Sequence, residues 1–178
     1  MFPLSHICSF IVPPQLDGHG KVATDVGAQV EIPCTVLSYP PATEIIFKRN
    51  GEEITTGGRY RLQNIETNVD NMSYKQSRSL VITSTSEADY GNYICEATNS
   101  EDTASAMLTL MRTTVPDAPS DIEVSSVEWG EAMITWSPGF DGGKQQRFQV
   151  YYGAAGEERK MVETIELYYN LQGLCSIH

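Results

Sequence analysis

Apolar and polar residues alternate along most of the chain, which is the pattern of β-strands that bury one face. The alternation is clearest in residues 30–37, where Val30, Ile32, Cys34 and Val36 fall on one face. The same period appears in four shorter stretches, 44–49, 79–83, 92–98 and 105–111. Turn-forming residues separate these stretches, and Asn50-Gly51 is a strong hairpin signal. Short alternating strands at regular spacing predict an all-β fold, either a sandwich or a barrel.

A proline-containing segment at residues 113–119 interrupts the strand pattern. Pro116 and Pro119 cannot lie inside a central strand, so the segment is predicted to be a semi-rigid linker or the entry to an edge strand. Alternation resumes after it, first at Ile134 and Trp136. We therefore expect an unassigned N-terminal segment at 1–13, one domain at 14–113 and a second at 114–178.

Charge and hydropathy exclude several classes of function. The 178 residues include 12 Lys and Arg against 23 Asp and Glu, a net charge of −11, and both predicted domains are acidic. Neither therefore has the basic surface that nucleic acids or anionic membranes attract. The sequence contains no apolar run of about 18 residues, and its first 14 residues form no clear signal peptide.

Four cysteines occupy positions 8, 34, 95 and 175. Cys34 and Cys95 each lie on the inward face of a predicted strand, so they form either a disulfide between two sheets or a pair of reduced, buried thiols. The chain has no CxxC motif and its three histidines are scattered, so no metal site is expected. Cys8 and Cys175 are either free thiols, or bonded to partners outside the 178 residues, or paired with each other.

The residues around Cys95 resemble the immunoglobulin superfamily. Residues 89–95 read Asp-Tyr-Gly-Asn-Tyr-Ile-Cys, which is similar to the family's D-x-G-x-Y-x-C motif. The resemblance implies an intermediate-set (I-set) immunoglobulin sandwich with a Cys34–Cys95 disulfide. It makes Tyr93 the tyrosine corner, whose hydroxyl binds the backbone upstream. One departure is Phe47, which stands where the family has its core tryptophan.

The same motif assigns a salt-bridge role to Asp89. In the family this carboxylate pairs with an arginine at the start of strand D. Arg59 is the candidate here, and Arg61 is the second choice.

The second predicted domain resembles a fibronectin type III sandwich. The resemblance rests on Pro116-x-x-Pro119, on Trp136, and on two patterned stretches at 148–152 and 169–174. Residues 136–148 are similar to the membrane-proximal type III domain of nephrin- and echinoid-like adhesion proteins. The family's strands F and G have no counterpart in the 178 residues. We therefore expect the domain to be incomplete, with the inner faces of Trp136, Phe148, Val150 and Tyr152 exposed to water.

Three kinds of site are considered. No catalytic motif is present, so neither an enzyme nor a cofactor is expected. Asn71-Met72-Ser73 is a glycosylation sequon. If the inward faces are assigned correctly, Ile46, Ile94 and Met107 lie together on an outer face, rimmed by Glu44, Lys48, Glu96 and Thr98. They form a candidate interface.

The resemblance implies cell–cell recognition through protein–protein binding at the extracellular face of the plasma membrane. The expected partner is another immunoglobulin-superfamily ectodomain, in homophilic or heterophilic contact. One alternative is a structural module of an intracellular muscle giant protein, which combines the same two folds. Another is a piece of a receptor phosphatase or receptor kinase ectodomain.

Overall fold

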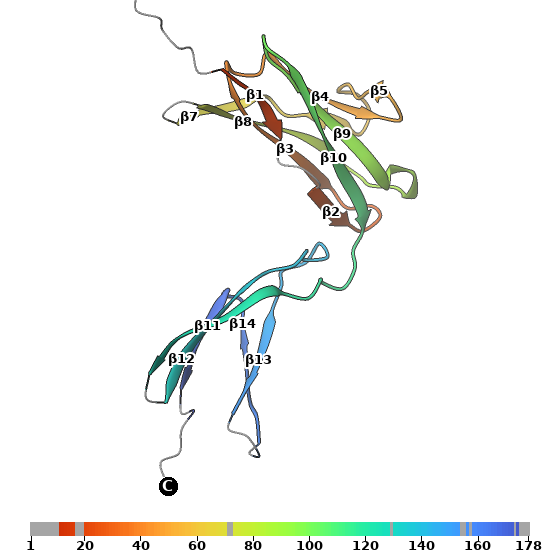
Figure 1. Cartoon of the computed structure of the whole chain (residues 1–178). Helices are drawn as coiled ribbons and strands as arrows, with labels where there is room; N and C mark the ends of the chain where they lie inside the picture. The colour runs from red at the N-terminus through yellow and green to blue at the C-terminus, as the bar shows by residue number, and fades with distance from the viewer. Residues whose placement is uncertain are drawn as a thin grey trace, which may run out of the picture. The chain divides into compact units, whose positions relative to one another are not determined.

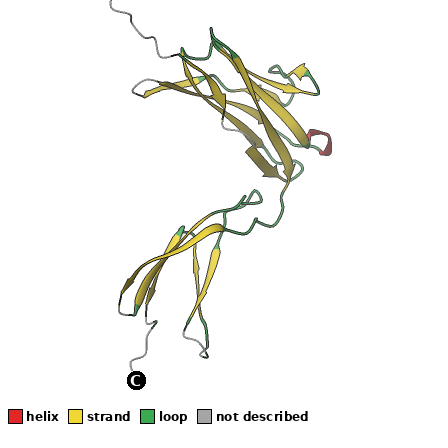
Figure 2. Ribbon diagram, viewed as in Figure 1, coloured by secondary structure: helices red, strands yellow, loops and turns green. Residues whose placement is uncertain are grey.

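A computed structural model describes residues 11–16, 20–70, 73–128, 130–153, 156, 158–172 and 174. The chain divides into two compact units, Met1–Arg112 and Thr113–His178 (Figure 1). Strands dominate both units, and the one helix in the described ranges is a single 3-10 turn, η1 (Glu87–Asp89) (Figure 2). The expectation of an all-β fold is therefore confirmed.

The first unit consists of two five-stranded sheets. The first sheet contains β1 (Val12–Leu16), β3 (Val30–Tyr39), β8 (Ser73–Ile82), β6 (Tyr60–Leu62) and β7 (Glu66–Asp70). The second contains β2 (Gly20–Thr24), β10 (Thr103–Arg112), β9 (Gly91–Thr98), β4 (Glu44–Arg49) and β5 (Glu52–Glu53). Neighbouring strands are antiparallel, except that β2 runs parallel to β10. The N-terminal part of the chain therefore contributes one strand to each sheet.

The core lies between these sheets and follows the alternation of the sequence. Along β3 the even-numbered residues from Val30 to Ser38 are buried, and the intervening side chains are more exposed. On the facing sheet Ile45 and Phe47 of β4 have no exposed surface. Asn50 and Gly51 both adopt positive φ, as the predicted tight turn between β4 and β5 requires.

A disulfide joins the two sheets at the centre of this core. Cys34 of β3 is bonded to Cys95 of β9, and their Cα atoms are 6.3 Å apart. Phe47 lies directly opposite Cys95 in the β4–β9 register and is fully buried. Phenylalanine therefore provides the aromatic packing beside the disulfide at the position where the resemblance leads one to expect tryptophan.

The second unit has a three-stranded sheet, β11 (Ser120–Glu128), β12 (Glu131–Ser137) and β15 (Tyr168–Gln172), and a two-stranded sheet, β13 (Phe148–Tyr152) and β14 (Lys160–Thr164). Trp136 and Phe148 pack across the two sheets with ring centroids 5.3 Å apart. Trp136 is 8% exposed, so the expectation that its face meets water is wrong, because the Phe148 ring packs against it. Ile122 and Val124 of β11 are among the exposed apolar side chains of this unit.

We predict that the Cys34–Cys95 bond supplies much of the stability of the first unit. The bond closes a loop of 61 residues, for which the chain-entropy model gives about 4 kcal/mol. Reduction should therefore lower the urea midpoint of this unit markedly, as followed by circular dichroism.

The control is a Cys34→Ala/Cys95→Ala variant, which should already unfold at the lower midpoint and should not respond to reductant. Identical unfolding curves of the wild-type chain with and without reductant would contradict the prediction.

Candidate functional site

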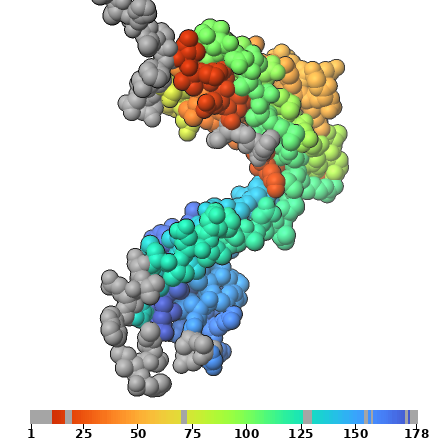
Figure 3. All heavy atoms as spheres, viewed as in Figure 1, coloured from red at the N-terminus to blue at the C-terminus, as the bar shows by residue number. Residues whose placement is uncertain are grey.

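The candidate site is the outer face of the sheet formed by β2, β10, β9, β4 and β5. The residues of β9 and β10 are among the green spheres of Figure 3. Alternation along each strand directs Ile46, Ile94 and Met107 away from the core. Ile94 lies opposite Met107 on β10. Met107 is 39% exposed, whereas Ile46 and Ile94 are half-buried.

An ion pair crosses this face between two of the predicted residues. Lys48 lies opposite Ile94, and Glu96 lies opposite Ile46. Lys48 Nζ is 2.6 Å from Glu96 Oε1. This ion pair joins two diagonally placed residues and therefore lies between Ile46 and Ile94. The structure therefore brings Ile94 and Met107 side by side but separates Ile46 from them. Lys48 and Glu96 lie within the patch, although the sequence placed them at its rim.

Polar side chains on the same strands have partners of their own. Thr109 Oγ1 donates to Asn92 Oδ1 at 3.0 Å, and the hydroxyls of Thr98 and Thr103 are 2.9 Å apart. Because these groups are paired, covering the face would not leave them without a hydrogen bond. The result is a small apolar centre with polar surroundings, which is the usual composition of a protein-binding surface.

A second cluster, around Asp89, fixes the chain just before β9. The Asp89 side chain is fully buried. Arg59 donates to both of its oxygens, from Nη1 at 2.5 Å and from Nη2 at 3.0 Å. The Tyr60 hydroxyl donates at 2.7 Å, and the Ser86 backbone N–H and hydroxyl donate at 2.7 and 2.8 Å. The carboxylate thus ties the start of β6 to the η1 turn.

The tyrosine corner adjoins this cluster. The Tyr93 hydroxyl donates to the backbone oxygen of Asp89 at 2.7 Å. Arg49, to which the family motif assigns no role, lies with its guanidinium 5.0 Å from the centre of the Tyr93 ring and its Nη1 lies 3.8 Å from Asp89 Oδ1. Arg59 is the arginine bonded to the carboxylate, and Arg61 is an exposed residue of β6.

Burial and these contacts shift the pKa values of Asp89 and Tyr93, and they also raise the pKa of Tyr60. Burial alone would raise the pKa of Asp89, but the hydrogen bonds from Tyr60, Ser86 and Arg59 outweigh it and lower the pKa below its usual value. Burial raises the pKa of Tyr93 to about 12. At neutral pH Asp89 is therefore charged and Tyr93 is protonated, so the cluster keeps its salt bridge and its tyrosine corner.

Some predicted positions lie outside the described residues, namely Cys8, Asn71 and Cys175. Within the described ranges, no group of three or more His, Cys, Asp or Glu residues is arranged to hold a metal ion. The same part of the chain contains no helix with the length and hydropathy needed to cross a membrane.

Comparison with known proteins gives one family and several relatives. Residues 13–99 match the family model "Immunoglobulin domain". Human nephrin is 38% identical over 81 residues, which are 45% of this chain and 6% of nephrin. Human fast-type myosin-binding protein C is 30% identical over 181 residues, covering 86% of this chain and 15% of that protein. Bovine neural cell adhesion molecule 1 is 32% identical over 147 residues, covering 82% of this chain and 16% of that protein.

Two solved structures are also similar. Titin domains A168–A170 cover 92% of this chain and 56% of their own, with 23% identity and a TM-score of 0.42. A complex of Dpr2 Ig1-Ig2 with DIP-Theta Ig1-Ig3 covers 57% of this chain and 33% of the matched chain, with 22% identity and a TM-score of 0.48. The chain spans less than a fifth of each of the three relatives named above.

We predict that Asp89→Asn lowers the free energy of unfolding at pH 7 by about 2 kcal/mol, since hydrogen bonds to a charged group contribute about 1.5–3 kcal/mol. The pKa of Asp89 is lower in the folded protein than in the unfolded chain. Its contribution is therefore complete above about pH 4 and is lost as the pH falls through the folded pKa. Urea titrations at pH 7 and at about pH 3 should show the difference between wild type and variant shrinking.

Asp102→Asn is the matched control, because Asp102 is exposed and its Oδ1 acceptor for Thr103 N–H is retained by asparagine. This control should change stability little at either pH. A wild-type advantage over Asp89→Asn that persisted undiminished at low pH would contradict the assignment.

Proposed function

Because residues 13–99 form an immunoglobulin domain with homology to those of nephrin and neural cell adhesion molecule 1, we propose that this chain is part of a cell-surface adhesion protein. It binds another immunoglobulin-type ectodomain through the outer face centred on Ile94 and Met107. The observation that carries the proposal is this face itself, where an exposed methionine adjoins a half-buried isoleucine among paired polar groups. Removing water from such a surface on binding costs little free energy, because its polar groups already have partners.

An oxidising setting agrees with the covalent structure. Disulfides persist outside the cell and are rare in the cytosol. The bonded pair Cys34–Cys95 therefore favours an extracellular location, as does the sequon at Asn71. One relative, neural cell adhesion molecule 1, is by its name an adhesion protein.

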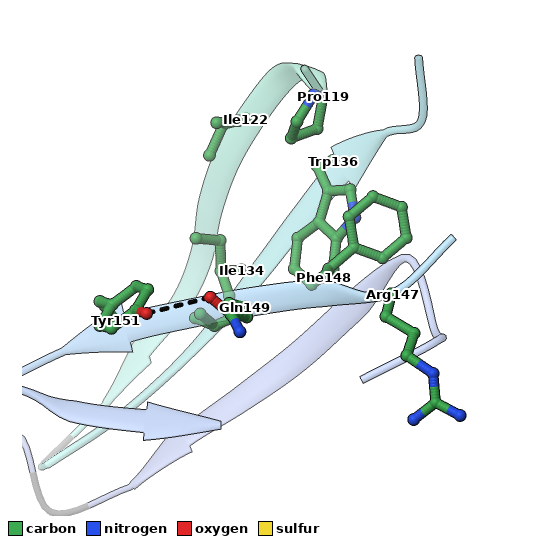
Figure 4. Close-up of a pocket in the computed structure, with 9 residues that line it drawn as sticks. Pro119, Ile122, Ile134, Trp136, Arg147, Phe148, Gln149 and Tyr151 are labelled. Carbon is green, nitrogen blue, oxygen red and sulfur yellow. Dashed lines mark hydrogen bonds between the residues drawn. The ribbon is translucent and has the colours of Figure 1, made fainter. Parts of the chain in front are cut away.

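The second unit fits a fibronectin type III domain in this proposal. Its three-stranded and two-stranded sheets pack through Trp136 and Phe148 (Figure 4), two of the residues on which that resemblance rests.

A module of a muscle protein is the second candidate. The observation in its favour is the alignment with myosin-binding protein C, which extends over 86% of this chain and hence into both units. Intact mass under non-reducing conditions separates the two candidates in the native protein. An oxidised Cys34–Cys95 pair agrees with the adhesion candidate, whereas reduced thiols agree with the cytosolic one.

We predict that Met107→Lys weakens binding about tenfold, because it places a charge at the centre of the contact, where it must be desolvated. Beads coated with this chain should cluster with each other, or with beads that carry the matched segment of nephrin. The double variant Ile46→Lys/Ile94→Lys should abolish clustering, since it adds two charges to the same face.

Met161→Lys is the matched control. Met161 is also an exposed methionine on a strand, at 51% exposure, but it belongs to β14 of the second unit. Clustering should survive this substitution. If Met107→Lys beads cluster as well as wild-type beads while carrying equal amounts of folded protein, the outer face is not the interface.

We also predict that Asn71 carries a glycan when the chain passes through the secretory pathway. Peptide N-glycosidase should then lower the mass of the secreted wild-type chain and leave the mass of Asn71→Gln unchanged. A wild-type mass that the enzyme does not alter would remove the sequon's support for an extracellular location.

A further inference from the structure

The turn between β4 and β5 contains the one Asn-Gly pair in the sequence, Asn50-Gly51. Both residues are exposed, and both adopt positive φ, 52° for Asn50 and 84° for Gly51. Arg49 pairs with Glu52, so the turn consists of these two residues alone. The pair shapes the hairpin, and the binding face described above makes no use of it.

An asparagine followed by glycine has a nucleophile within its own chain. The backbone nitrogen of the following residue reaches the carbonyl carbon of the asparagine side chain by closing a five-membered ring, and proximity favours such a reaction. Glycine has no side chain to hinder this approach, whereas a β-branched residue is bulky and stiff beside the reacting nitrogen. Asparagine is one of the chemically labile residues of proteins.

The local structure leaves both reacting groups free. Neither the Asn50 side chain nor the Gly51 backbone N–H forms a hydrogen bond with any described residue. A Cβ atom built at Gly51 would meet no atom within 4 Å beyond its chain neighbours, so the space beside the turn is open. The turn must flex before the nitrogen reaches the side-chain carbon, and nothing packed against Gly51 opposes that movement.

Two other asparagines each lack one of these conditions. Asn64 is also exposed in a loop, but it is followed by the β-branched Ile65. Asn99 is followed by the small Ser100, but its side chain is buried and its Oδ1 accepts two backbone N–H donors, each at 3.0 Å. The chain therefore contains a control for the neighbouring residue and a control for the local structure.

We propose that Asn50 is a site of spontaneous deamidation in the folded protein. Hydroxide removes the proton of the Gly51 N–H, the nitrogen forms a bond to Asn50 Cγ, and the Cγ–Nδ2 bond breaks. The leaving nitrogen takes a proton from water and departs as ammonia. Water then opens the cyclic imide to an aspartate or an isoaspartate at position 50, and no group is oxidised or reduced. The inference goes beyond the proposed function and does not depend on it.

The products change the hairpin in two ways. Each adds a carboxylate to a turn that is followed by Glu52 and Glu53. An isoaspartate also adds a carbon atom to the main chain, so the pairing of Arg49 with Glu52 across a two-residue turn is disturbed. Beyond β5 the Ile54 N–H donates to the Phe47 oxygen at 2.8 Å, so the change should stop there.

The test incubates the whole folded chain at mildly alkaline pH and follows its peptides by mass spectrometry after digestion. The peptide with Asn50 should gain the mass difference between an amide and a carboxylic acid about tenfold faster than the peptide with Asn64. Asn99 should stay unmodified in the folded chain and react in urea, where its hydrogen bonds are lost. Mildly acidic pH should slow the reaction, because less hydroxide is present.

Asn50→Asp is the matched variant, because it begins with the product carboxylate and aspartate tolerates positive φ. Its peptide should show no mass gain at position 50 under the same conditions. An isoaspartyl methyltransferase should label the aged wild-type chain at position 50, which identifies the isoaspartate. Nuclear magnetic resonance of that chain should show shifted amides at Glu52 and Glu53 and an unchanged amide at Phe47.

Two outcomes would overturn the inference. The first is a folded chain in which Asn50 stays unmodified while the chain in urea reacts there, since the turn would then protect the side chain. The second is an equal rate at Asn50 and Asn64, since the glycine would then confer no reactivity.

Discussion

The bond between Cys34 and Cys95 is the constraint on which the first unit depends, because it holds β3 and β9 together across the core. β9 is also fixed before its first residue, where Asp89 accepts hydrogen bonds from Arg59, Tyr60 and Ser86. Two anchors within seven residues set the position and register of β9. These anchors also determine which side chains form the outer face. Tyr93 and Cys95 point into the core, so Ile94, which lies between them, points away from it.

Strands that bury one face could be predicted from the sequence. Residues 30–37, 44–49, 92–98 and 105–111 lie within β3, β4, β9 and β10, with the predicted faces inward. β1 and β2 were not predicted, because Pro13 and Pro14 obscure the first and Gly20 begins the second. Their pairing depends on distant partners, β3 and β10, which no local pattern indicates.

The candidate site could be predicted in part for the same reason. Alternation indicates the face on which Ile46, Ile94 and Met107 lie, and the family motif pointed to Arg59 as the partner of Asp89. The Lys48–Glu96 pair could not be foreseen, because it joins residues on a diagonal that exists only in the actual register of β4 and β9. The contact of Arg49 with the Tyr93 ring could not be foreseen, because it depends on a long side chain reaching across from a neighbouring strand.

The same packing rule leaves the two units in different states. In the first unit five strands face five, so every inward apolar row is covered and the available surface is an outer face of side chains. In the second unit the described strands form a sheet of three and a sheet of two, and Trp136 is buried where Phe148 of the facing sheet packs against it. Ile122 and Val124 of β11 continue the alternation but are 60% and 57% exposed. An inward position in the strand pattern therefore predicts burial only where a strand of the facing sheet lies over it.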